Sequence, residues 1–297
     1  VSLSGANAQI TGDAANNEFE VVVDNGSVVV RGLNGTTINQ GTTVFTLATG
    51  SSTFAGSLTA SLGAGDDIAT VGPGITFGGN VSIAGQAGAD TLRARTGTYN
   101  GHLSLMGGDG ASSIVVDDAT VSGNLSVDGQ GAMIISITNS TVGGQLDVRT
   151  GRENSPDSVV IKATTVAQKT TIETGKGDDN IVLQNSHFNG QLIMHTGAGN
   201  DVVYIDGSSV GKLSLIATQR GDDMLQVLNS SSFSRLMIFA GGVGHDGTSI
   251  AGDTTARRVI KGSQKARYFA PTTIALPLRQ QVRLQWLMLC GTLQCPH

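Results

Sequence analysis

Pairs of oxygen-bearing side chains recur directly after a glycine-rich turn. The stretch TGKGDDNIVL at 174–183 returns 22 residues later as TGAGNDVVYI and a further 22 residues later as TQRGDDMLQV. Glycine permits the positive φ of a tight turn, but the acids need another explanation. Carboxylates stacked about 5 Å apart repel each other by about 1 kcal/mol in water, and by several times that near a protein surface.

A calcium ion would offset this repulsion, because Ca²⁺ takes about six to eight oxygen ligands. The sequence therefore suggests Ca²⁺ as a cofactor along part of one stack of turns. The alternative is structural, since such side chains also bond to nearby backbone as Asx turns. The candidate ligands are Asp178, Asp179, Asn200, Asp201, Asp222 and Asp223 on three successive repeats, with Asp66, Asp67 and Asp90 as a second group.

A second set of reactive side chains follows the other strand of each repeat. Arg149, Glu173 and His195 occupy nearly equivalent places, and Asp147 lies beside Arg149 in the sequence. An acid, a base and a cation in line could cleave an acidic polysaccharide by general acid–base chemistry. The alternative is a ladder of ion pairs on a solvated face. Because the repeats leave no long loops to build a cleft, the sequence favours the ion pairs over an enzyme.

Both sets depend on a regular repeat that must position them. Single residues at the turn follow one another at 22-residue intervals, with one interval of 24. We expect these residues to line up along one edge of the molecule, which requires the repeats to stack. The marking residues are Gly63, Gly85, Gly107, Gly129, Gly151, Gly175, Gly197, Gln219 and Gly241.

Each repeat contains two alternating strands. Pairs such as Ile181 and Leu183 in the first strand, or Leu103 and Leu105 in the second, have the period of two that places both side chains on one face. A Ser/Thr pair between the strands marks a corner, where hydroxyls can bond to backbone or to each other. A unit of this size cannot close its own core, so we expect an all-β solenoid of about nine coils, roughly 40 Å long. The methionines at 106, 133, 194, 224 and 237 are interpreted as core filler.

From about residue 41 to 247 the chain resembles the right-handed parallel β-helix proteins. Its turns are similar to the G-G-x-G-x-D calcium-binding repeats of secreted bacterial proteins, although here one such turn occurs in each 22 residues. The resemblance implies a right-handed parallel β-helix with calcium at the turns. It does not fix an activity, because this fold carries lyases, adhesins and ice-binding proteins alike.

The two ends differ from the middle. Residues 1–40 include FEVVVDNGSVVVRG at 19–32, two alternating strands around an Asp-Asn-Gly turn. This pattern predicts a β-hairpin, which would cap the exposed strand edges of a solenoid. Residues 248–297 form a basic tail that fits no coil. It is interpreted as a C-terminal cap, a partner-docking segment or sequence read out of frame.

Charge and composition narrow the function further. Up to Gly247 there are 22 acids against 11 Lys and Arg, so nucleic acid is not the expected partner. No apolar run is long enough for a membrane span, and no signal sequence opens the chain. We expect a structural or adhesive module of a secreted or cell-surface bacterial protein, whose partner is a surface ligand or polysaccharide. The alternative is a lyase-like enzyme acting on polysaccharide through Asp147, Arg149, Glu173 and His195.

Overall fold

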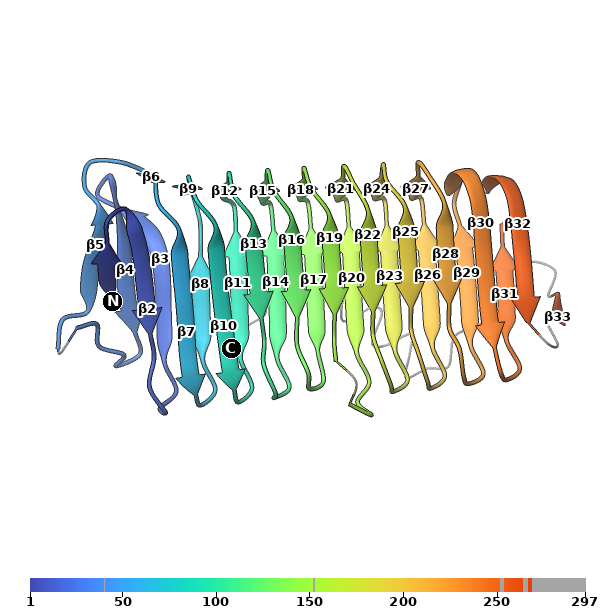
Figure 1. The fold of residues 1–297 in the computed structure, drawn as a ribbon, viewed down its shortest axis with the longest axis horizontal. Coiled ribbons are helices and arrows are strands. Elements are labelled where there is room, and N and C mark those ends of the chain that lie inside the picture. Colours follow the sequence, from blue (N-terminus) through green and yellow to red (C-terminus); the bar gives the residue numbers. More distant parts are fainter. Residues whose placement is uncertain (40, 152, 252–253, 264–266, 269–297) are drawn as a thin grey trace.

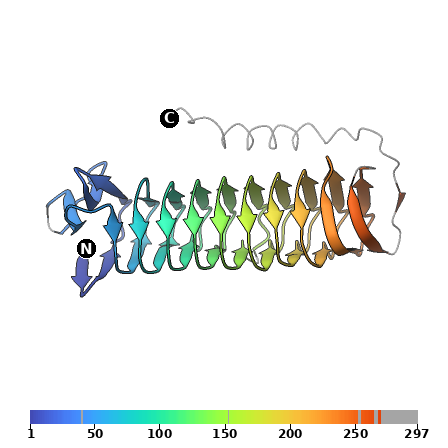
Figure 2. The same ribbon diagram turned by 90° about the horizontal axis from the view of Figure 1, so that it is seen from above.

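The computed structural model describes residues 1–39, 41–151, 153–251, 254–263 and 267–268. The chain winds into parallel coils stacked along one axis, a β-solenoid of about nine turns that repeat about every 22 residues (Figures 1 and 2). The prediction of a stacked all-β solenoid is thereby confirmed. Two sheets face each other across the interior, and each coil contributes a strand to both.

The first sheet, sheet B, receives one strand of four or five residues from most coils, paired in parallel with the next. Alternate side chains point inward, so Ile181 and Leu183 are fully buried, as the period of two predicts. Its parallel strands are β8 (Ile68–Val71), β11 (Thr91–Arg95), β14 (Ser113–Asp117), β17 (Ile134–Thr138), β20 (Ser158–Lys162), β23 (Asn180–Gln184), β26 (Val202–Asp206), β29 (Met224–Leu228), β31 (Gly247–Ile250) and β33 (Arg267–Tyr268).

The opposite sheet, sheet A, contains the second strand of each coil. Leu103 and Leu105 point inward and are fully buried. Its long strands are β7 (Leu58–Ala64), β10 (Val81–Ala87), β13 (Leu103–Met106), β16 (Leu125–Asp128), β19 (Leu146–Arg149), β22 (Thr170–Glu173), β25 (Leu192–His195), β28 (Ser214–Ala217), β30 (Ser232–Gly242) and β32 (Thr255–Ser263).

A two-residue strand precedes most long strands of sheet A and adds a third, narrow side to the coil. These strands also pair in parallel from coil to coil. They are β6 (Thr53–Phe54), β9 (Thr76–Phe77), β12 (Thr98–Tyr99), β15 (Thr120–Val121), β18 (Thr141–Val142), β21 (Thr165–Val166), β24 (His187–Phe188) and β27 (Ser209–Val210).

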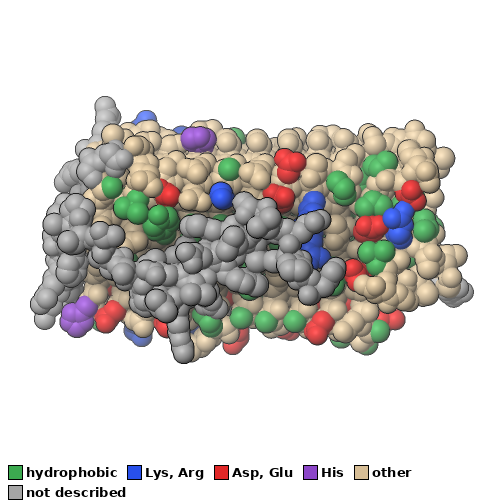
Figure 3. All heavy atoms as spheres, turned by 180° about the vertical axis from the view of Figure 1, so that it is seen from behind, with side chains coloured by type: hydrophobic (Ala, Val, Ile, Leu, Met, Phe, Trp, Pro, Cys, Tyr) green, Lys and Arg blue, Asp and Glu red, His purple; other side chains and the backbone are tan. Residues whose placement is uncertain are grey.

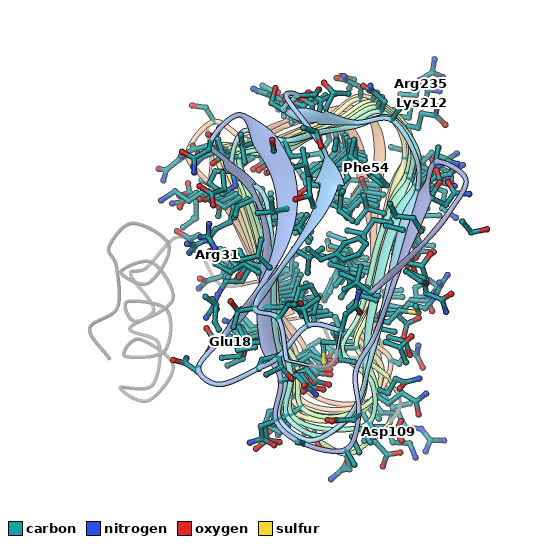
Figure 4. All side chains as sticks on the ribbon, turned by 90° about the vertical axis from the view of Figure 1, so that its left-hand side faces the viewer. Glu18, Arg31, Phe54, Asp109, Lys212 and Arg235 are labelled. Atoms are coloured by element: carbon teal, nitrogen blue, oxygen red, sulfur yellow. The ribbon has the colours of Figure 1, made fainter. Side chains whose placement is uncertain are left out.

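The core is a continuous column of aliphatic side chains closed at one end by aromatic rings. Phe54 points into the interior (Figure 4) and meets Phe77 edge-on, with ring centroids 6.5 Å apart. Phe77 in turn stacks on Tyr99 at 5.4 Å. All three rings lie in consecutive coils at the same register position. Parallel stacking therefore repeats a contact from coil to coil wherever the sequence repeats a residue type.

The predicted single column of turn glycines is wrong in detail, because coil lengths vary. β10 follows β7 with Val81 opposite Leu58, a step of 23 residues, so Gln86 and not Gly85 lies opposite Gly63. The step from β16 to β19 is 21 residues, Leu125 to Leu146. These changes cancel in the glycine spacing. The marks lie on one edge of the solenoid but in two adjacent columns, with Gly63, Gly151, Gly175, Gly197 and Gln219 in one and Gly85, Gly107, Gly129 and Gly241 in the other.

The predicted corner of small hydroxyls is confirmed and is buried. The backbone turns through a left-handed residue such as Asn185 (φ 49°), a conformation that asparagine tolerates, and a buried hydroxyl follows. The Thr164 N–H donates to Ser186 Oγ at 3.2 Å, and Ser186 Oγ donates to the Gln184 carbonyl at 2.9 Å. The same pattern runs through Ser140, Thr164, Ser186, Ser208 and Ser231.

A second ladder lies at the corner between the short and long strands of sheet A. The N–H of His102 donates to Asn80 Oδ1 at 2.8 Å, and the N–H of Asn124 donates to His102 Nδ1 at 2.9 Å. Gln145 continues the series by donating its N–H to Asn124 Oδ1. The amide groups of this corner thus find acceptors in the preceding coil, and exposed turns gain the partners that backbone N–H groups require.

The N-terminal hairpin is present as predicted. β3 (Glu18–Asp24) and β4 (Ser27–Leu33) pair antiparallel with Asp24 opposite Ser27, and Arg31 bonds to Glu20 at 2.8 Å across the pair. β3 continues in parallel into β8, whereas β5 (Val44–Ala48) pairs with β4 and forms the edge of sheet B. β1 (Ser2–Ser4) and β2 (Asn7–Thr11) form a second antiparallel pair joined to β7 in sheet A.

The boundary expected at residue 247 is wrong. β31 pairs in parallel with β29, and β32 pairs in parallel with β30, so the solenoid continues beyond it. These coils lack the G-x-G-x-D turn on which the boundary was based, but they keep the strands. The rest of the expected basic tail, residues 269–297, lies outside the described residues.

The outward side of sheet B differs from the apolar interior. Figure 3 views the molecule from behind and shows acidic, basic and hydrophobic side chains interspersed on the part of that face that is described. Within the described residues, no helix has the length and apolar character needed to cross a membrane.

Candidate functional site

The aspartate turns form one long edge of the solenoid, where each coil passes from sheet A to sheet B. Along this edge the second oxygen-bearing residue of each pair points inward. Asp179, Asp201 and Asp223 are each at most 2% exposed. They are two residues before Ile181, Val203 and Leu225, so they share the inward phase of the buried strand residues. The alternation of the strand therefore extends into the turn, a signal in the sequence that the calcium hypothesis did not use.

The inward residues form a ladder of hydrogen bonds that we call the inner ladder. Asp201 Oδ1 accepts the N–H of Asp179 at 2.9 Å, and Asp223 Oδ1 accepts the N–H of Asp201 at the same distance. Each carboxyl thus pairs with the amide of the preceding coil. The members are Asp67, Asp90, Asp157, Asp179, Asp201, Asp223 and Asp246, with Ser112 in one coil.

The second oxygen of each inner carboxyl is treated differently from coil to coil. The hydroxyls of Thr150 and Thr196 donate to Oδ2 of Asp157 and Asp201, respectively. The hydroxyl of Thr174 instead donates to the Thr196 carbonyl at 3.2 Å. Oδ2 of Asp179 is buried without a hydrogen-bond donor, and the same holds for Oδ2 of Asp67, Asp90, Asp223 and Asp246.

Burial in this column favours the neutral acid. It raises the pKa of Asp179 to about 8 and the pKa of Asp201 to about 7. The pKa values of Asp157 and Asp223 rise to about 6 for the same reason. In each case removal from water is the largest cause, and hydrogen bonds from threonine and backbone N–H groups partly offset it. A carboxyl protonated at Oδ2 can donate to a threonine Oγ, which supplies the partner that the orphaned oxygen lacks.

The first residue of each pair forms an outer ladder with the opposite polarity. Asp178 Oδ1 accepts the N–H of Asn200 at 2.8 Å, and Asn200 Oδ1 accepts the N–H of Asp222 at 2.8 Å. Here the side chain bonds to the following coil, whereas inner carboxyls bond to the preceding one. Asp66 makes the equivalent bond to the Ala89 N–H. Two adjacent residues in one turn therefore hold the coil to both of its neighbours.

The predicted calcium ligands are thus divided between two environments. Asp67, Asp90, Asp179, Asp201 and Asp223 are buried and bonded to backbone amides, whereas Asp66, Asp178, Asn200 and Asp222 lie on the outside. Within the described part of the chain, no three His, Cys, Asp or Glu side chains are grouped closely enough to hold a metal ion. The observed bonds resemble the structural alternative, except that they connect neighbouring coils.

The candidate catalytic residues lie together on the outer face of sheet A. Arg149 Nη2 is 2.8 Å from Asp147 Oδ2, and Arg149 Nε is 3.5 Å from Glu173 Oε2. Glu173 lies in register between Arg149 and His195. Comparisons with family models, curated proteins and solved structures found no match for this chain. The function must therefore be argued from this geometry alone.

A hollow beside this column was missed from the sequence. It is lined by Gln86, Met106, Asp109, Asp128 and Gln130, together with alanines and glycines. Met106, interpreted above as core, is 37% exposed. Because Leu103 and Leu105 point inward, alternation places Met106 outward, so its exposure was predictable. No sequence pattern marked Asp109.

Proposed function

We propose that this protein is a structural or adhesive module of a secreted or cell-surface bacterial protein, with the solenoid as an extended rod. The observation that carries the proposal is the set of hydrogen-bonded ladders along the edges. Turn amides are satisfied by side chains of the adjacent coil, so each coil stabilises the next. Such repetition favours an elongated, regular body that presents a side wall or an end to a partner.

The enzymatic alternative has weaker support. Arg149 is engaged by Asp147 and Glu173 in a pattern typical of surface ion pairs. The side chains of Arg149 and Glu173 are each about half exposed, at 46% and 45%. Such solvated groups gain little of the electrostatic strength that a water-excluded catalytic site provides.

We carry calcium forward as a proposal confined to the outer ladder. Asp178 and Asp222 each use Oδ1 for a backbone amide, which leaves Oδ2 for an ion. If calcium binds there, the thermal unfolding midpoint should rise when calcium chloride is added and fall with a chelator, and Asp178→Asn should weaken both effects. Equal midpoints in calcium and in chelator would refute this part of the proposal.

The surface role has a separate test. Antibodies raised against the purified solenoid should label intact cells that produce the protein, and fractionation should recover it outside the cytoplasm. A label that appears only after the cells are permeabilised would refute the proposal. Activity assays on uronate polymers with Glu173→Ala and His195→Ala provide the matching test of the enzymatic alternative, which requires activity that both substitutions abolish.

A further inference from the structure

The hollow on the aspartate edge has the size of a small-molecule site. Its volume is about 450 Å³, within the range of ligand pockets. Three successive coils contribute to it, through Gln86, then Met106 and Asp109, then Asp128 and Gln130. Figure 4 shows Asp109 at the lower outer edge of the solenoid. The hollow therefore lies along the side of the rod, open to solvent.

Small residues and a shortened coil create this space. At the outer-ladder positions, Asp66 is followed in the next two coils by Ala89 and Ala111. The turn after β16 is shorter than its neighbours, because the step from Leu125 to Leu146 is 21 residues. Glycines at 108 and 129 line the hollow without side chains of their own. The repeat thus departs from its pattern at this place.

The charge in the hollow is negative and lacks a cation of its own. Asp109 is exposed, and among the described residues it forms no ion pair. Asp128 is half-buried, and removal from water raises its pKa even though Arg149 lowers it. Arg149 is itself held by Asp147 and Glu173. Two carboxylates on neighbouring coils, about 4.8 Å apart along the axis, are therefore incompletely neutralised.

The remaining lining suits an aliphatic chain. Met106 offers an exposed, polarizable thioether that adapts to the shape of methylene groups. The side-chain carbonyls of Gln86 and Gln130, both exposed, can accept hydrogen bonds from N–H donors at either end of the hollow. Carboxylates and amide carbonyls around an apolar surface match a ligand with ammonium groups separated by methylenes.

We propose that the hollow binds a linear aliphatic polyamine, with its ammonium groups on Asp109 and Asp128 and its methylenes on Met106. The binding depends on the local arrangement of these three side chains, and the acidity of the body as a whole is not sufficient for it. This site goes beyond the proposed surface role and does not require it.

Methionine methyl NMR with spermidine as the probe tests the proposal. The chain has six methionines, and Met106→Leu assigns the signal of Met106. We expect spermidine to shift this signal saturably, while the buried Met133 and Met194 signals stay in place. The double substitution Asp109→Asn and Asp128→Asn should weaken binding at least about tenfold, equivalent to about 1.4 kcal/mol.

A matched control separates this site from general acidity. The double substitution Asp178→Asn and Asp222→Asn removes the same charge from the outer ladder and keeps its oxygen acceptors, so binding should be unchanged. An uncharged diol of similar length should not shift the Met106 signal. The proposal is overturned if spermidine leaves the Met106 signal unmoved, or if both double variants weaken binding equally. Neither result affects the cell-labelling test of the surface role.

Discussion

The inner ladder predicts that the solenoid loses stability as the pH rises from mildly acidic to mildly alkaline values. Asp179 carries the largest effect, because burial raises its pKa from 3.8 to about 8. The folded state therefore holds a proton that the unfolded state has released in this window. The stabilisation is complete below about pH 3.8 and is lost as the pH rises through about 8.

The size of the effect follows from the shift. About four pKa units at about 1.4 kcal/mol each give about 5 to 6 kcal/mol between pH 4 and pH 8. Relaxation and water entry reduce such penalties in proteins, so we expect an observed change of about 1 to 3 kcal/mol. Asp179→Asn should remove this dependence, since its amide oxygen still accepts the Asp157 N–H and its NH₂ group can donate to Thr174 Oγ1.

Urea unfolding followed by circular dichroism at pH 4.5 and pH 8 provides the assay. The wild-type midpoint should fall between the two pH values, whereas that of Asp179→Asn should fall less and exceed the wild-type value at pH 8. Asp178→Asn is the control, because this neighbouring side chain is exposed and bonds to the Asn200 N–H. A wild-type midpoint that is higher at pH 8, or an Asp179→Asn variant destabilised equally at both pH values, would refute the reasoning.

Three further predictions concern the frame that holds this edge. Phe77→Ala removes a fully buried ring from between Phe54 and Tyr99 and should cost about 3–5 kcal/mol in chemical unfolding; a loss below about 1 kcal/mol would contradict the packing. Ser186→Ala leaves the buried Thr164 N–H without its acceptor and should cost about 1–3 kcal/mol, whereas the outward Thr165→Ala should change the unfolding midpoint little. Gly199→Ala places a Cβ 2.0 Å from the Gly177 carbonyl oxygen at a φ of +139° and should lower the thermal midpoint strongly. Gly35→Ala shares a positive φ but meets nothing within 4 Å, so equal losses in these two variants would show that backbone strain alone is responsible.

The sequence predicts the strands well because each alternates on a hydrophobic face. Ile181 and Leu183 repeat a pattern that only a buried strand explains, and the Asp24-Asn25-Gly26 turn specifies its hairpin locally. Coil register is harder, because steps of 23 and 21 residues leave the glycine spacing unchanged. Register is set by contacts between coils, which a constant sequence period does not report.

The site was less predictable for a related reason. Asp178 and Asp179 look equivalent in the sequence, yet one bonds forward to Asn200 and the other bonds back to Asp157. The direction of each bond along the axis is a property of the stacked turns. The exposure of Met106 followed from strand alternation, whereas the hollow beside it depends on missing volume in three coils.

The two opposed ladders make the joints between many coils chemically interchangeable. The bond from the Asp179 N–H to Asp201 is repeated between Asp201 and Asp223, so excising one whole coil would present the same donor to the same kind of acceptor. Gene duplication or deletion in units of 22 residues could then lengthen or shorten this protein while leaving every remaining joint intact. Its reach would be an inherited trait that varies in discrete steps.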